Sequence, residues 1–223
     1  MLRHFWMIVL GWCLASGLAA QEYENLNPPR STEDPAKVEV IEFFWYGCPH
    51  CNRFDPYLED WAKDKPDDVT FKRQPVIFGS NWAPQARAYF TAEVLGVVDT
   101  IHSDFFKAMH VDKKSMSGEE ELATFFADHG VEREAFNNAF HSFAVDMKMR
   151  QAEVVAAEYG ITGVPALVVN GKYKVTGRTA KSYDNMITVL KKLVEQERQQ
   201  LTDRARADGG EKNDGANPET SQF

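Results

Sequence analysis

Hydrophobic and polar positions along the chain predict two groups of strands separated by a block of helices. The run VEVIEFFWY, at residues 38–46, is mostly apolar and of strand length, which is typical of a strand covered on both faces. NRFDPYLEDWAKD, at residues 52–64, follows with apolar residues at helical spacing, and VTFKRQPVIF, at residues 69–78, predicts a second strand. The order strand, helix, strand predicts a βαβ unit.

The second half of the chain predicts a different unit. Residues 83–159 have a helical pattern throughout. PALVVNGKYKV, at residues 165–175, then predicts a hairpin whose tight turn is Asn170-Gly171, and residues 182–198 form an amphipathic helical pattern. A βαβ unit and a ββα unit that share one sheet make an α/β domain, so we expect the intervening residues to form a helical insertion that caps it.

These patterns give the expected domain boundaries. We expect residues 21–80 and 151–202 to form the α/β domain and residues 81–150 to form the helical insertion. Residues 203–223 contain almost no apolar side chains, so we expect a disordered tail there.

The first twenty residues have the three parts of a secretory signal. Arg3 and His4 form a basic start, residues 5–14 form an apolar run, and the small residues of ASGLAA suit a cleavage site. The apolar run is too short to span a bilayer. We therefore expect export to the periplasm, with cleavage after Ala19 or Ala20.

Composition and charge narrow the class of protein. With 223 residues, 43% of them hydrophobic, the chain can build one sizeable domain, or one domain with an insertion. A formal net charge of −8 argues against nucleic acid or an anionic membrane as the main partner. Cleavage of the signal would remove Cys13 and leave Cys48 and Cys51, an even number that suits an oxidising compartment.

The sequence Cys48-Pro49-His50-Cys51 ends the first apolar run, and three interpretations compete for it. A zinc site needs two more ligands, and the remaining histidines show no paired ligand spacing. A purely structural disulfide across so short a loop gains little, because the entropic gain is smallest for short loops. A redox-active dithiol at the start of a helix is the favoured interpretation, and it needs no metal or other cofactor.

Helix physics assigns the two cysteines different roles. Pro49 fits the first helical turn, so Cys48 lies at the amino end, where unpaired N–H groups and a partial positive charge stabilise a thiolate. His50 can add a positive charge or a donor. Cys51, one turn further, is expected to be the buried partner. A stabilised Cys48 thiolate favours the reduced pair, so the disulfide is readily donated to other proteins' dithiols.

The motif CPHC after EFFWYG, followed far downstream by GVPALVVNGKY, resembles the DsbA family of thiol:disulfide interchange proteins. The resemblance implies a thioredoxin-like sheet with flanking helices and an inserted all-helical cap domain. It also implies a protein dithiol oxidase that donates its Cys48–Cys51 disulfide to reduced cysteine pairs of newly exported proteins. An inner-membrane, quinone-linked reoxidant of the DsbB kind is the implied partner, and we expect a monomer.

The resemblance implies further site residues. Pro165 would be a cis-proline beside the active site, preceded by Val164, with a backbone that pairs with the substrate peptide like an added strand. The family also carries acidic residues beneath the active site that influence proton transfer to the buried cysteine. Glu42 is the first candidate, because a charged residue inside an apolar strand needs a special reason. Asp55, on the following helix, is either a second such group or a solvated residue.

Two other functions stay open on the residues themselves. The first is a disulfide isomerase or reductase, although isomerases commonly need a dimerisation module and the sequence has no spare domain for one. The second is a peptide-binding periplasmic chaperone that uses the helical cap and a groove, with a structural disulfide. A Cys48→Ser substitution separates these classes, since it should abolish dithiol oxidation and leave chaperone activity intact.

Overall fold

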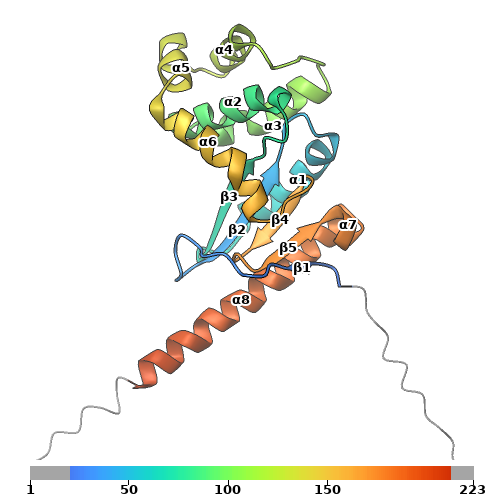
Figure 1. Ribbon diagram of the computed structural model, residues 1–223, viewed down its shortest axis with the longest axis vertical. Helices are drawn as coiled ribbons and strands as arrows, with labels where there is room; N and C mark the ends of the chain where they lie inside the picture. The colour runs from blue at the N-terminus through green and yellow to red at the C-terminus, as the bar shows by residue number, and fades with distance from the viewer. Residues whose placement is uncertain (1–20, 212–223) are drawn as a thin grey trace, which may run out of the picture.

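The computed structural model describes residues 21–211 (Figure 1). The signal expected at residues 1–20 and the end of the expected tail, residues 212–223, lie outside the described residues. Among the helices within residues 21–211, none combines the length and the apolar character needed to cross a bilayer.

A mixed sheet forms the centre of the described chain (Figure 1). In space its strands follow the order β1-β5-β4-β2-β3. β2 and β3 run parallel, whereas β2 with β4, β4 with β5 and β5 with β1 are antiparallel. The strand bounds are β1 Glu24–Asn25, β2 Val38–Phe44, β3 Val69–Pro75, β4 Ala166–Val169 and β5 Tyr173–Thr176.

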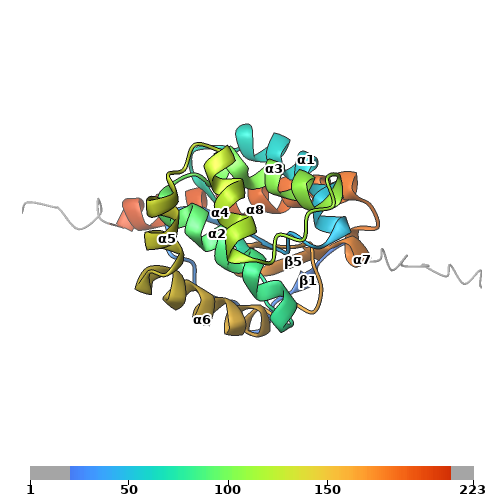
Figure 2. The same cartoon turned by 90° about the horizontal axis from the view of Figure 1, so that it is seen from above.

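Helices cover the sheet and build the insertion. Their bounds are α1 Pro49–Lys63, α2 Ala83–Leu95, α3 Val98–His110, α4 Glu119–Asp128, α5 Arg133–Phe140, α6 Phe143–Glu158, α7 Gly177–Ala180 and α8 Tyr183–Glu211, with a short 3-10 turn, η1, at Ser80–Trp82. Helices α2 to α6 gather at one end of the molecule and α8 lies at the other (Figure 1). In the view from above, the helices of the insertion lie in front of the sheet (Figure 2). The predicted α/β fold with a helical insertion is confirmed.

The central strand β2 is buried along its whole length, because both of its faces are covered. On one face, Val38 and Val40 join a core cluster that includes residues of α1 and α8. On the other face, Ile41 and Phe43 pack with Val155 of α6. A third cluster joins the insertion to the end of β2 and contains both cysteines of the CPHC motif.

The insertion boundary differs from the expected one. The sequence pattern predicts that the insertion ends at residue 150 and that the α/β domain resumes at residue 151, but this boundary falls inside α6. The first part of this helix packs into the core of the insertion through Val145 and Met149, whereas Val155 packs near the sheet. One continuous helix therefore serves both parts of the chain.

The tail also differs, because α8 continues to Glu211, so residues 203–211 are helical rather than disordered. Gln199 donates to Asp203 at 2.9 Å, and Arg206 lies 3.9 Å from the same carboxylate. These i,i+4 and i,i+3 pairs extend a helix that packing has already nucleated, even where apolar residues are lacking.

The predicted hairpin is confirmed. Asn170 and Gly171 have positive φ angles of 50° and 63°, which a tight turn of this kind requires. The sequence pattern missed β1, whose two residues pair with Lys174 and Tyr173 of β5. A strand of this length carries no periodic signal.

Candidate active site

Helix α1 begins directly after Cys48, which is its N-cap with extended backbone (φ −81°, ψ 117°). Pro49 takes the first helical position, where a missing N–H breaks no helical hydrogen bond. The Cys48 N–H donates to the carbonyl of Trp45 at 3.0 Å. The first cysteine therefore lies at the positive end of α1, as predicted.

The two thiols have opposite acidities. The pKa of Cys48 is lowered to about 6, first by the hydrogen bond from the Cys51 thiol, then by the backbone N–H groups and the charge of His50, against the effect of partial burial. Burial, together with the negative charge of Cys48, raises the pKa of Cys51 well above its usual value. The pair is in its reduced form. At neutral pH the lowered pKa favours the thiolate of Cys48, and the raised pKa keeps Cys51 a thiol that can donate a hydrogen bond to it.

His50 is exposed and is held from two sides. Its Nδ1 lies 3.0 Å from the hydroxyl of Tyr183, at the start of α8, and 3.0 Å from a guanidinium nitrogen of Arg53. A guanidinium only donates hydrogen bonds, so Nδ1 is the acceptor and the ring proton is on Nε2. In this tautomer the ring is neutral, and only its protonated form adds a positive charge near Cys48.

The loop before β4 lies against the first cysteine. The peptide bond between Val164 and Pro165 is cis, as the resemblance implies, and the Cys48 sulfur lies 3.4 Å from the Val164 carbonyl oxygen. A pocket of about 610 Å³ opens beside this loop, lined by residues 161–166, His50 and the region from β5 to the start of α8. The pocket therefore borders the loop whose Val164 carbonyl lies next to the Cys48 sulfur.

An aromatic surface flanks the cysteine pair. The rings of Trp45 and Trp82 stack with centroids 3.9 Å apart and an interplanar angle of 10°. Phe78, which is 47% exposed, lies 5.2 Å from the Trp82 ring. Trp45 and Val164 pack together against the core of the insertion. We call Trp45, Phe78 and Trp82 the aromatic platform.

Glu42 is buried on β2 beside a basic partner. Its Oε2 lies 3.3 Å from Nε of Arg73, its register partner on β3, and Arg73 also donates to Glu59 on α1. Burial raises the pKa of Glu42 to about 8; Arg73 opposes this shift, and the charges of Asp55 and Glu59 add to it. The Glu42 carboxyl is therefore mostly protonated at neutral pH, and it titrates close to that pH.

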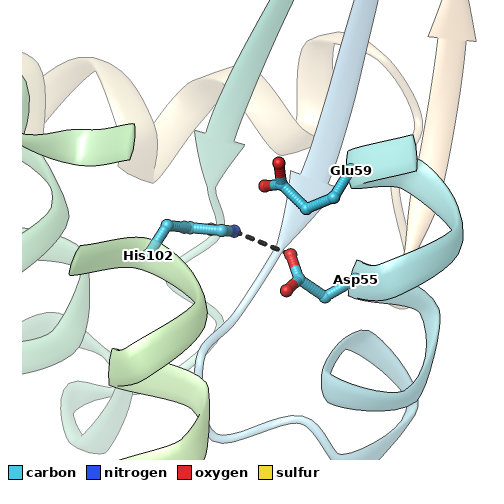
Figure 3. A group of neighbouring side chains, drawn as sticks. All are labelled: Asp55, Glu59 and His102. Carbon is cyan, nitrogen blue, oxygen red and sulfur yellow. Dashed lines mark ion pairs between the residues drawn. The ribbon is translucent and has the colours of Figure 1, made fainter. Parts of the chain in front are cut away.

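Asp55 is buried, at 5% exposed, so the interpretation of it as a solvated residue is wrong. Its Oδ1 lies 3.2 Å from Nε2 of His102 on α3 (Figure 3), and its Oδ2 accepts a hydrogen bond from Ser103 at 2.9 Å. Burial alone would raise its pKa, but the contacts with His102 and Ser103 and the charge of Arg73 outweigh burial and lower it. Asp55 is thus an ionised carboxylate inside the protein.

The same residues include a possible metal-ligand set. Ligand atoms of Asp55, Glu59 and His102 lie within 4.8 Å of one another (Figure 3). Arg73, however, already donates to Glu59, and its fixed positive charge opposes a cation at this place. Ser103 likewise occupies one oxygen of Asp55. The donors form a buried polar network in which the protein's own groups supply the partners.

Comparisons with known proteins decide the family. A family model described as "DSBA-like thioredoxin domain" matches residues 75–191. The thiol:disulfide interchange protein DsbA of Azotobacter vinelandii is 41% identical over 178 residues, which cover 80% of this chain and 83% of the relative. The protein of the same name from Pseudomonas aeruginosa is 39% identical over 180 residues, or 81% and 85% of the two chains. The chain belongs to the DsbA family.

Solved DsbA structures agree with this fold. A crystal structure of Pseudomonas aeruginosa DsbA matches with a TM-score of 0.77 at 38% identity, over 82% of this chain and 95% of that one. The DsbA of Xylella fastidiosa matches with a TM-score of 0.74 at 35% identity, over 80% and 96%. The family model begins after the CPHC motif, so it includes the Val164–Pro165 loop but not the cysteines.

In this DsbA-family chain, the predicted site residues fall into two layers. Pro49, His50, Val164 and Pro165 lie near Cys48, which is 8% exposed, whereas Cys51, Glu42 and Asp55 are 5% exposed or less. The sequence interpretation missed Arg53, Tyr183, Ser103 and His102. His102 did carry a signal, because a histidine on the apolar face of a predicted helix needs a polar partner.

Proposed function

We propose that this DsbA-family protein is a protein dithiol oxidase, which donates the Cys48–Cys51 disulfide to reduced cysteine pairs of exported proteins. One observation carries the proposal: Cys48 is the N-cap of α1 with a lowered pKa, while Cys51 is buried with a raised one. This asymmetry makes Cys48 the better leaving group and the reduced pair the favoured form.

The reaction follows from this asymmetry. A substrate thiolate attacks the Cys48 sulfur, the bond to Cys51 breaks, and the Cys51 sulfur takes up a proton. A second substrate thiolate then attacks the substrate sulfur of the mixed disulfide, and Cys48 leaves as a thiolate. The substrate loses two electrons and forms a disulfide, and the protein gains those electrons. Glu42 is the proposed proton donor for Cys51, since it is mostly protonated at neutral pH.

The lowered Cys48 pKa makes the disulfide more oxidising. At pH 7, lowering the Cys48 pKa from 9.0 to about 6 stabilises the reduced form by about 1.4 kcal/mol. For a two-electron couple, this raises the reduction potential by about 30 mV. The disulfide is thereby a stronger oxidant than one formed between two ordinary thiols.

Substrate binding is proposed at the loop and the pocket beside Cys48. The backbone at Val164 and Pro165 would pair with an extended peptide as an added strand. This loop would hold the substrate next to the sulfur, because the Val164 carbonyl already lies 3.4 Å from it. The aromatic platform would contact apolar side chains next to the substrate cysteine.

Partners and location complete the proposal. Family membership supports reduced substrate proteins and a reoxidising partner in general, and we propose an inner-membrane, quinone-linked protein of the DsbB kind for that role. We further propose a periplasmic monomer, exported through the signal at residues 1–20, that works with its dithiol alone and without a bound cofactor.

A redox titration against glutathione, combined with oxidation of a two-cysteine peptide, tests the activity. We expect peptide oxidation in the wild-type protein and none in the Cys48→Ser variant. The Cys51→Ala variant should also fail to oxidise the peptide, yet its Cys48 thiolate should attack oxidised glutathione, release one glutathione thiolate and hold the other half as a stable mixed disulfide. A potential as low as that of thioredoxin, about −270 mV, would contradict the oxidase direction. Chaperone activity without any dithiol oxidation would favour the binding-protein alternative.

A further inference from the structure

We infer that His102 of the helical insertion is a positioning residue of the redox site, which orients the Asp55 carboxylate and ties both cysteine-bearing segments to α3. The inference deepens the proposed function, since it names a residue that acts on the same cysteine pair. Neither the CPHC motif nor the loop at Pro165 contains His102.

One imidazole ring contacts both segments that carry the cysteines. Its Nδ1 lies 2.8 Å from the hydroxyl of Tyr46, two residues before Cys48. Its Nε2 lies 3.2 Å from Oδ1 of Asp55, one helical turn after Cys51 on α1. Figure 3 shows the ring and the carboxylate pointing toward each other from α3 and α1. Any shift of α3 against α1 would break this bridge.

The chemistry of the partners determines the state of the ring. A carboxylate only accepts hydrogen bonds, so the nitrogen that faces it, Nε2, carries the ring proton and lies at ion-pair distance from Asp55, 3.2 Å. Nδ1 then accepts from Tyr46, whose pKa is raised by burial, so that its hydroxyl stays protonated. In this tautomer Nδ1 has the Tyr46 hydroxyl as its hydrogen-bond partner and Nε2 faces Oδ1 of Asp55, while Ser103 donates to the other oxygen of that carboxylate.

The residues around the His102 imidazole exclude water from it and keep it uncharged. His102 is 2% exposed, and the rings of Phe44 and Phe106 pack edge-on against it with centroids 5.3 and 5.2 Å away. Burial lowers its pKa to about 4, with Asp55 opposing the shift and the charge of Arg73 adding to it. The charged and titratable groups that act on it are Asp55 from α1, Arg73 from β3, Tyr89 from α2, Tyr46 from the segment after β2, and Asp99 from α3 itself.

The effect reaches the cysteines through two carboxyl groups. The contact with His102 favours the ionised form of Asp55, and the charge of Asp55 raises the pKa of Glu42. The charge of Glu42 in turn raises the pKa of Cys51. Loss of the donor at residue 102 should therefore let Asp55 take up a proton and let Glu42 ionise at lower pH.

The test measures the glutathione redox equilibrium from about pH 5 to about pH 9, where a buried carboxyl of this kind titrates. A Glu42→Gln variant identifies the inflection that belongs to Glu42. The matched pair is His102→Asn, which withdraws the donor from Asp55, and His102→Gln, whose longer amide reaches the carboxylate. We expect the inflection to move about 1 pH unit lower in the Asn variant and to stay near the wild-type value in the Gln variant.

Two further variants separate positioning from simple stabilisation. Asp55→Asn should reproduce the shift, and adding His102→Asn to it should move the inflection no further, because both act through one carboxylate. His129 forms a similar pair with Asp104 at 3.2 Å within the insertion, so His129→Gln is the control and should leave the inflection unchanged.

The results distinguish this inference from the proposed function. The wild-type titration alone decides whether the protein is an oxidant. Equal inflections in the Asn and Gln variants of His102, with lower melting temperatures in both, would overturn the inference and leave His102 a purely structural residue.

Discussion

The sulfur of Cys48 lies 3.4 Å from the carbonyl oxygen of Val164, although 116 residues separate them in the chain. The helical insertion lies between these residues in the sequence, and the sheet brings its two ends back together through the antiparallel pair β2 and β4. The reactive sulfur and the backbone proposed to hold the substrate are thus fixed by neighbouring strands.

Removal of the Cys51 thiol should raise the pKa of Cys48. The hydrogen bond from Cys51 is the largest cause of the lowered Cys48 pKa of about 6. In Cys51→Ala, the thiolate loses this donor and keeps only backbone N–H groups and the charge of His50, so its pKa should rise by about 1 unit or more. Ultraviolet absorbance of the thiolate as a function of pH measures the change. Cys51→Ser keeps an O–H donor and is the control; an equal rise in both variants would contradict this cause.

Substitution of His50 should have a smaller effect on the same sulfur. The charge of His50 is the least of the causes that lower the Cys48 pKa. His50→Ala keeps the backbone N–H but removes the ring, so we expect the pKa to rise by less than about 1 unit. Arg53→Gln keeps the ring while removing one of its two partners, and it should change the pKa less. A shift in His50→Ala as large as that in Cys51→Ala would show that the ring dominates.

Several of these residues could be predicted from the sequence because each carries a local signal. Pro49 marks the first turn of a helix, which places Cys48 at its amino end, and Glu42 interrupts an apolar strand. Asn170-Gly171 likewise marks a hairpin turn. Pro49 and Asn170-Gly171 fit the helix start and the turn that the neighbouring pattern predicts, whereas Glu42 is a charge that an apolar strand does not explain.

His102 and Tyr183 could not be assigned a role in the same way. Periodicity predicts which face of a helix is buried, but it does not predict which distant residue meets that face. His50 meets Tyr183 across 133 residues, and Tyr46 meets His102 across 56. The burial of Asp55 likewise could not be predicted, because it depends on α3, which packs against α1 in the fold.

Glu42 should make the protein less stable as pH rises. Its pKa is about 8 in the folded protein and 4.5 in the unfolded reference, so the folded state holds an extra proton between these values. The stability linked to this proton is fully present below about pH 4.5 and is lost by up to about 1.4 kcal/mol per pH unit as pH rises toward 8. Urea unfolding of the wild type and of Glu42→Gln at several pH values measures this pH-dependent part of the free energy of unfolding.

The Gln variant supplies the reference for that measurement. Its side chain does not titrate, so its stability relative to the wild type should increase between about pH 5 and pH 8. A constant difference across this range would mean that Glu42 has an ordinary pKa. Arg73 keeps Glu59 as a partner in the variant, so its charge is not left isolated.

Truncation after Thr202 should change stability little. Leu201 of α8 packs against the core cluster of α1 and α8, and residues 203–207 are exposed. Surface helix contacts contribute only a few tenths of a kcal/mol each, so we expect a loss below about 1 kcal/mol. Thermal unfolding measures the loss. Truncation after Gln196 is the contrasting variant, because it removes Leu201 and Glu197, whose side chain is fully buried. Equal losses would mean that the end of α8 packs more tightly than described.

The aromatic platform should matter for peptide substrates and not for small thiols. Phe78 is 47% exposed and lies 5.2 Å from Trp82, so its removal should leave the core intact. In Phe78→Ser we expect the KM for an unfolded two-cysteine peptide to rise about threefold to tenfold, since an aromatic contact contributes about 0.5–1.5 kcal/mol. The rate of glutathione oxidation should stay unchanged, because glutathione has no apolar side chain to place there. Phe143→Ser, which removes a ring that is 74% exposed on α6, is the matched control. Equal KM changes in the two variants would show that general surface hydrophobicity, rather than the platform beside Cys48, attracts the peptide.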